Sequence, residues 1–163
     1  MDIRKIFEYA LPREYEGKRF FEMNASRLSH AVAAGAFMNL AEEEQRHIEF
    51  IQDQINALDS GNEPSLALGE SLADKGFFSQ RATSEKVDST VLEAMIPDLP
   101  VLRMAYLIEH DFAEFYERSA EKADGTPKKV LQMLAAWERG HERLFKNMHD
   151  QAFELYSNMP WGG

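Results

Sequence analysis

A chain of 163 residues with 44% hydrophobic and 28% charged residues can bury one substantial core, so we expect a single domain over 1–163. The formal net charge of −10 disfavours nucleic acid and anionic membrane surfaces as partners, because both would repel the protein. The absence of cysteine excludes disulfides, iron–sulfur clusters and thiolate metal sites, so any metal ligands must be oxygen or nitrogen atoms.

The N-terminal residues do not have the pattern of a signal peptide. No stretch approaches the roughly 18 apolar residues that a membrane-spanning helix needs. We therefore expect a soluble protein of the cytoplasm.

Helical periodicity predicts two long helices in the first part of the chain, over 3–28 and 31–58. Pro12 lies inside the first of them, where it removes a backbone donor and clashes with the preceding turn. The first helix should therefore kink or break just before Glu14.

A long connection, 59–99, separates these helices from two more, predicted over 100–123 and 127–156. This connection is long for a loop and should contain one short helix near 89–95. A bundle helix of about 28 residues is roughly 40 Å long, so the connection is predicted to be a crossover that returns along the bundle. The expected fold class is all-α, a ferritin-like four-helix bundle of two antiparallel hairpins joined by that crossover.

The two predicted hairpins resemble each other in sequence. Glu14–Ala25 aligns with Glu109–Ala120, sharing Glu, Phe, Glu and Ala in place. Leu40–His47 aligns with Leu134–His141, sharing Leu, Ala, Glu and His. We interpret the chain as a duplicated hairpin.

All four predicted helices carry acid on the face that their apolar pattern would bury. On the second and fourth helices a histidine follows a glutamate by three residues, so both side chains point the same way. Four unpaired buried carboxylates would be costly, whereas two divalent cations would neutralise them. The predicted metal ligands are Glu14, Glu44, His47, Glu109, Glu138 and His141.

Within this set we expect Glu44 and Glu138 to bridge two metals, and each histidine to bind one of them. Glu14 and Glu109 would then be terminal ligands.

Two further positions near these ligands have alternative interpretations. Tyr116, two turns after Glu109, is interpreted as a packed core residue with a satisfied hydroxyl, although it could instead hydrogen-bond a ligand carboxylate or pass an electron. Glu42 and Glu43 flank the buried face, and we expect such flanking glutamates on solvated helix surfaces. The alternative is that one of them accepts a hydrogen bond beside the site or guides iron into it.

A glutamate followed by Glu-x-x-His, repeated in the second hairpin, resembles the rubrerythrin branch of the ferritin-like di-iron carboxylate superfamily. The resemblance covers both hairpins and implies that the six residues bind two iron ions. Manganese or zinc would suit the same ligands. It also implies an oxidoreductase that reduces hydrogen peroxide or dioxygen, with a role in oxidative stress and a homodimeric assembly.

Two departures from the rubrerythrin pattern bear on function. The chain lacks a cysteine-rich rubredoxin-like module, so its electrons would come from an external donor such as a rubredoxin. Phe112 lies where rubrerythrins that reduce peroxide have an additional glutamate, which argues against peroxidase chemistry. The alternatives are an iron-binding or ferroxidase protein for iron handling, and a non-catalytic bundle with a vestigial metal site.

Overall fold

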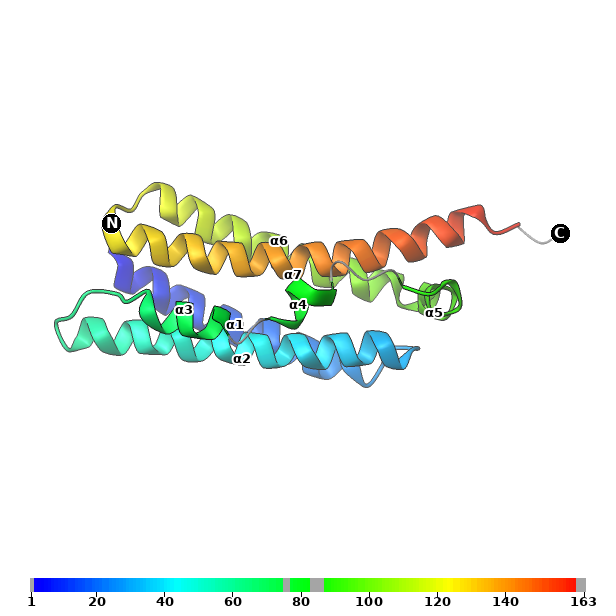
Figure 1. Ribbon diagram of the computed structural model, residues 1–163, viewed down its shortest axis with the longest axis horizontal. Coiled ribbons are helices and arrows are strands. Elements are labelled where there is room, and N and C mark those ends of the chain that lie inside the picture. The colour runs from blue at the N-terminus through cyan, green and yellow to red at the C-terminus, as the bar shows by residue number, and fades with distance from the viewer. Residues whose placement is uncertain (1, 75–76, 83–86, 161–163) are drawn as a thin grey trace.

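The computed structural model describes residues 2–74, 77–82 and 87–160, and all the regular structure in these residues is helical. Its four long helices are α1 (Ile3–Ala25), α2 (Ala31–Asp59), α6 (Leu99–Glu121) and α7 (Gly125–Asn158). The first pair and the second pair each form an antiparallel hairpin, and the hairpins lie side by side (Figure 1). The predicted ferritin-like four-helix bundle is confirmed. The largest difference from the predicted bounds is at the end of α1, which stops at Ala25.

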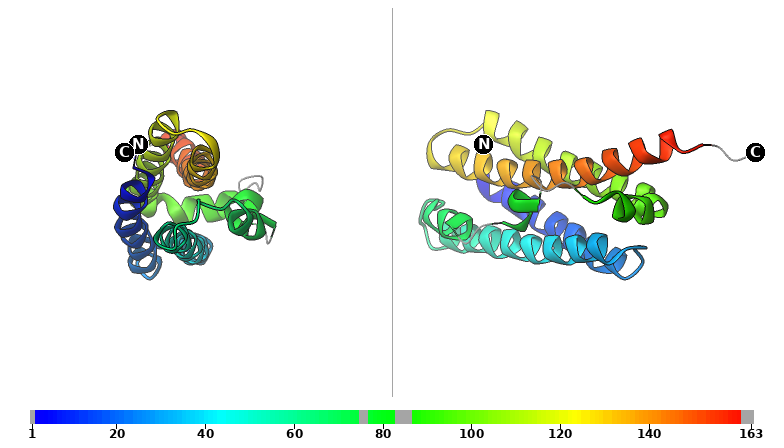
Figure 2. Two further views of the ribbon diagram at one scale, coloured as in Figure 1. Left: turned by 90° about the vertical axis from the view of Figure 1, so that its left-hand side faces the viewer. Right: turned by 45° about the vertical axis from the view of Figure 1, so that its right-hand side comes forward.

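The connection between α2 and α6 is the predicted crossover. It contains α3 (Ala67–Asp74), α4 (Phe78–Ala82), α5 (Ser89–Met95) and the 3₁₀ turn η1 (Ile96–Asp98). The predicted short helix is α5, whereas α3 and α4 were not expected. These short helices lie against α2 and α7 and leave α1 and α6 on the other side of the bundle (Figure 2).

Pro12 does not break α1, which is continuous from Ile3 to Ala25, so the predicted break is wrong. Pro12 and Glu8 are both exposed. The Glu8 carbonyl, which loses its helical donor to the proline, can therefore hydrogen-bond water at low cost.

Two clusters of buried apolar side chains fill the bundle, one toward each end. On α1, Glu14 lies between Phe7 of one cluster and Phe21 of the other, and all three side chains are fully buried. The acidic residues are thus held mid-bundle, between two dry layers.

Asp98 ties the two hairpins together at one end of the bundle. Its buried carboxylate accepts hydrogen bonds of 3.0 and 2.9 Å from the Ser29 backbone N–H and one of 3.0 Å from the Ser29 hydroxyl. The turn between α1 and α2 is thereby anchored to the start of α6.

None of the helices in the described residues is both long and apolar enough to cross a membrane.

Candidate metal centre

All six predicted ligands lie in the middle of the bundle, and each is at most 1% exposed. Four of them offer ligand atoms within 4.8 Å of one another, namely Glu44, His47, Glu138 and His141. The imidazoles of His47 and His141 are nearly parallel, with ring centroids 5.1 Å apart and 6° between their planes.

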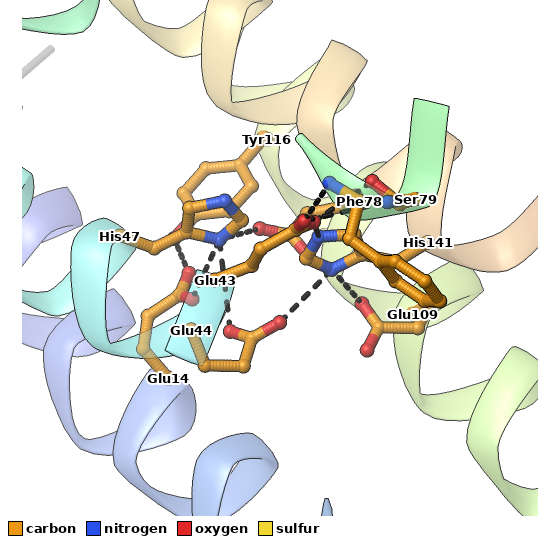
Figure 3. A network of polar contacts seen from close by, with 10 residues as sticks. Glu14, Glu43, Glu44, His47, Phe78, Ser79, Glu109, Tyr116 and His141 are labelled. Atoms are coloured by element: carbon orange, nitrogen blue, oxygen red, sulfur yellow. Dashed lines mark hydrogen bonds and ion pairs between the residues drawn. The ribbon is translucent and has the colours of Figure 1, made fainter. Parts of the chain in front are cut away.

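The Nδ1 atom of His47 faces carboxylates from three helices. It lies 2.8 Å from Glu138 Oε1, 3.4 Å from Glu14 Oε2 and 3.6 Å from Glu44 Oε2. Carboxylates from α1, α2 and α7 therefore surround this nitrogen. Figure 3 shows two of them, Glu14 and Glu44, beside the His47 ring.

His141 has the matching environment in the other hairpin. Its Nδ1 atom lies 2.9 Å from Glu44 Oε1, 3.3 Å from Glu109 Oε2 and 3.4 Å from Glu138 Oε2. Glu44 and Glu138 thus contact both imidazoles, whereas Glu14 and Glu109 contact one each. Two bridging and two terminal ligands would need this arrangement.

The unsatisfied polar atoms of the predicted ligands also fit a pair of metal ions. Among the buried side chains that the structure describes, eight nitrogen and oxygen atoms make no hydrogen bond of good geometry, although several lie close to another atom of the cluster, and all eight belong to predicted ligands. These residues are Glu14, Glu44, His47, Glu109 and Glu138. Buried polar atoms are normally paired, so a cluster of unpaired carboxylate and imidazole atoms marks a place where cations would bind.

The electrostatics divide the carboxylates into two kinds. Burial raises the pKa of Glu14 and Glu109 well above the ordinary value, and the neighbouring glutamates add to that effect. Burial also opposes ionisation of Glu44 and Glu138, but the two imidazoles outweigh it and lower the pKa of both carboxyls. The shared carboxyls therefore ionise more readily than the two terminal ones.

The histidines respond to those charges. Burial alone would lower the pKa of His47, but the negative charges of Glu138 and Glu44 raise it well above the ordinary value. His141 behaves in the same way beside Glu109. These raised pKa values favour bound protons in the metal-free cluster, and metal ions would displace protons from it.

Tyr116 is a core residue and also contacts a predicted ligand. It is 1% exposed, and its hydroxyl donates a hydrogen bond to Glu14 Oε1. Burial and the Glu14 charge raise the pKa of the phenol, so it stays protonated and remains a donor. Tyr116 is thus a packed core residue with a satisfied hydroxyl, and the partner of that hydroxyl is one of the predicted ligands.

Glu43 is not on a solvated surface, so that expectation is wrong. It is 2% exposed, and its Oε2 atom lies 3.0 Å from His141 Nε2. Its spacing from Leu40 and His47 gave a signal that could have identified it, because residues three and four apart share a helix face. Glu42, by contrast, is exposed as expected.

Phe112 and Gly17, which are equivalent positions in the two hairpins, contact each other across the bundle. A Cβ atom on Gly17 would lie 3.1 Å from the Phe112 ring and 3.8 Å from Glu44 Oε2. The missing side chain at 17 therefore makes room for the Phe112 ring close to a bridging carboxylate.

A cavity of about 290 Å³ between α1 and α6 reaches this side of the centre. Glu14 and Tyr116 form part of its wall, together with the aromatic rings of Tyr9, Phe112 and Phe115. A small molecule could approach the centre from the face opposite the crossover.

Comparison with known proteins identifies the family to which the chain belongs. No curated protein and no solved structure matched the chain. The family model described as Rubrerythrin matches residues 5–149, a segment that includes both hairpins and all six predicted ligands. The chain therefore belongs to the rubrerythrin family.

Proposed function

We propose that the six buried residues bind two metal ions, iron first among them, and that the protein reduces hydrogen peroxide or dioxygen. Electrons would come from an external donor such as a rubredoxin. The observation that carries the proposal is the pair of carboxylates, Glu44 and Glu138, that each contact both imidazoles. Such shared carboxylates hold two metal ions in di-iron bundles.

The charges of the ligand set support two divalent ions. Four carboxylates would carry four negative charges, which two divalent cations neutralise, while the imidazoles contribute neutral nitrogen ligands. Glu14 and His47 would hold one ion, and Glu109 and His141 the other. Reduction of hydrogen peroxide to two water molecules consumes two electrons and two protons, and two ferrous ions when bound would supply those two electrons.

The protein's own residues would position the ligands and control access. The apolar clusters on both sides keep bulk water out of the ligand set, which strengthens its electrostatic interactions. The Tyr116 hydroxyl holds Glu14 in place. The cavity between α1 and α6 offers a small oxidant a route to that carboxylate.

Phe112 supplies no ligand atom, so the proposal is for a centre of four carboxylates and two imidazoles only. Dioxygen is therefore proposed as an oxidant beside peroxide. The same reaction with each oxidant would decide which one the centre uses.

The test is anaerobic loading with ferrous ion, followed by rapid mixing with hydrogen peroxide or dioxygen. We expect one peroxide to oxidise two irons faster than it oxidises free ferrous ion. Glu138→Ala should lose this reaction, whereas Glu42→Ala, which alters an exposed glutamate beside the site, should retain it. Oxidation no faster than that of free ferrous ion would contradict the proposal.

Size-exclusion chromatography of the same sample addresses the iron-handling alternative. We propose a homodimer. A large assembly that oxidises many ferrous ions per centre would instead indicate an iron-storage protein.

A further inference from the structure

The residue that precedes each Glu-x-x-His differs between the two hairpins. It is Glu43 in α2 and Trp137 in α7, at equivalent positions of the internal repeat. Each contacts the histidine of the opposite hairpin, so the repeat gives the two histidines different neighbours.

Glu43 accepts a hydrogen bond from the far side of the His141 ring. Its Oε2 atom lies 3.0 Å from His141 Nε2, while the Nδ1 atom of the same ring faces Glu44 and Glu109. A metal on Nδ1 leaves the proton on Nε2, which would then donate to Glu43. A carboxylate in that position fixes the tautomer and orientation of the ring and makes its other nitrogen a stronger ligand.

The crossover holds Glu43 in this orientation. Its Oε2 atom accepts a 2.8 Å hydrogen bond from the Ser79 hydroxyl, and its Oε1 atom accepts from the backbone N–H groups of Phe78 and Ser79 (Figure 3). Every one of these donors lies in α4, the short helix that the sequence did not predict. The carboxylate is thus fixed from two sides before any metal binds.

Within the part of the chain that the structure describes, no carboxylate hydrogen-bonds the far side of the His47 ring. Its ring stacks on Trp137, with centroids 5.0 Å apart and 20° between the planes. Its Nε2 atom is buried and has no hydrogen-bond partner among the described residues. Stacking restrains the ring, but it does not add electron density to Nδ1 as a hydrogen-bonded carboxylate does.

A second difference between the hairpins also makes the ligands on the His47 side weaker than those on the His141 side. Tyr116 donates a hydrogen bond to Glu14, the terminal carboxylate beside His47. The equivalent position in the other hairpin is Phe21, which has no hydroxyl to donate. A donor on Glu14 competes with a metal for the carboxylate electrons, so the His47 side has both the weaker imidazole and the weaker terminal carboxylate.

We propose that the two metal positions are unequal, and that Glu43 is a positioning residue that makes the His141 position fill first and hold its ion more tightly. This inference rests on the proposed two-metal centre. Its consequence is stepwise loading: one ion binds at His141 and Glu109, and the second completes the pair at His47 and Glu14.

The test is a titration of the whole protein with Mn²⁺. Calorimetry measures the heat of each binding event, and electron paramagnetic resonance measures the Mn²⁺ that stays free. The wild-type protein should bind two ions in separate events. Glu43→Gln keeps the side-chain size but removes the charge, and it should weaken the tighter event by about 10–100-fold while leaving the weaker event unchanged.

Histidine variants assign the events to positions. His141→Ala should lose the tighter event, whereas His47→Ala should keep it and lose the weaker one. The reverse assignment would overturn the inference.

Three further variants guard against a purely structural effect. Glu42→Gln makes the same change on an exposed neighbour and should alter neither event. Ser79→Ala leaves the Glu43 charge in place but removes one of its donors, and it should weaken the tighter event by a smaller factor. Trp137→Phe keeps an aromatic ring on His47 and should leave the tighter event unchanged.

Two results separate failure of this inference from failure of the proposed function. Two ions that bind with equal affinity, or a folded Glu43→Gln protein with both events unchanged, would overturn the inference alone. A wild-type protein that binds no Mn²⁺ and no ferrous ion would overturn the metal centre and this inference with it.

Discussion

Tyr116 and Glu14 form a buried pair that joins α6 to α1 beside the centre. The phenol donates a hydrogen bond to one Glu14 oxygen, and the other carboxyl oxygen makes no hydrogen bond within the described residues. Removing the phenol oxygen of Tyr116 therefore measures how much this hydrogen bond contributes to the stability of the protein.

Tyr116→Phe should lower the free energy of unfolding of the metal-free protein by about 1–3 kcal/mol, because it leaves a buried carboxyl without its donor. Urea unfolding measures this change. Tyr9→Phe removes the same atom from a side chain that is 50% exposed, and it should change stability by less than about 0.5 kcal/mol. Equal losses in the two variants would contradict the assigned role of the Tyr116 hydrogen bond.

The six predicted ligands could be found from the sequence because acid at a core position of a helix needs a compensating charge. Glu43 is the middle residue of three consecutive glutamates, a run that is typical of a solvated helix face, so the sequence indicates a surface position. Its burial depends on α4, and no local pattern in the sequence predicted that helix or where it would pack.

At the scale of elements, α1 and α6 approach each other through a small residue facing a large one. Gly17 lies opposite Phe112, whereas Gly35 in α2 has no atom within 4 Å of its would-be Cβ. The two glycines therefore respond differently to the same added methyl group.

Gly35→Ala should stabilise the protein by about 0.5–1 kcal/mol, since alanine loses less backbone entropy in a helix. Gly17→Ala should gain much less or lose stability, because its Cβ would lie 3.1 Å from the Phe112 ring. Chemical unfolding of both variants measures the difference. In a Phe112→Ala background the benefit of Gly17→Ala should return, and equal gains at both glycines in the original background would contradict the contact.

The long helices and α5 were predictable because their apolar spacing and turn residues are local signals. The break at Pro12 was predicted wrongly because the cost of proline depends on whether the freed carbonyl is buried, and here that part of α1 is exposed. The helices α3 and α4 are short, and packing against α2 and α7 stabilises what periodicity over so few residues does not reveal.

At the scale of the whole molecule, the buried cluster couples folding, protons and metal ions. The pKa of Glu14, Glu109, His47 and His141 is raised in the folded, metal-free protein. A group with a raised pKa stabilises the fold fully below its unfolded pKa, and this contribution is lost as the pH rises through the folded pKa. The unfolded values are about 4.3 for glutamate and about 6.5 for histidine, so the metal-free protein should begin to lose stability above about pH 4.3 through the glutamates, and lose it more steeply above about pH 6.5 through the histidines.

Metal ions replace these protons, so the gain in Tm on adding Mn²⁺ should be larger at about pH 8 than at about pH 6. Differential scanning calorimetry with and without Mn²⁺ at the two pH values measures this. A Glu44→Ala, His141→Ala double variant should gain little at either pH. An equal gain of the wild-type protein at both pH values would contradict the proton-for-metal exchange.

The central claim is that the bundle holds two metal ions on six buried residues, and elemental analysis tests it most directly. The wild-type protein, Glu44→Ala and His141→Ala would each be loaded with ferrous ion without oxygen, freed of unbound metal and analysed. We predict about two irons per wild-type chain and fewer in both variants, as the ligand geometry of di-iron bundles requires. No stoichiometric metal in the wild-type protein, or binding that neither substitution reduces, would contradict the account.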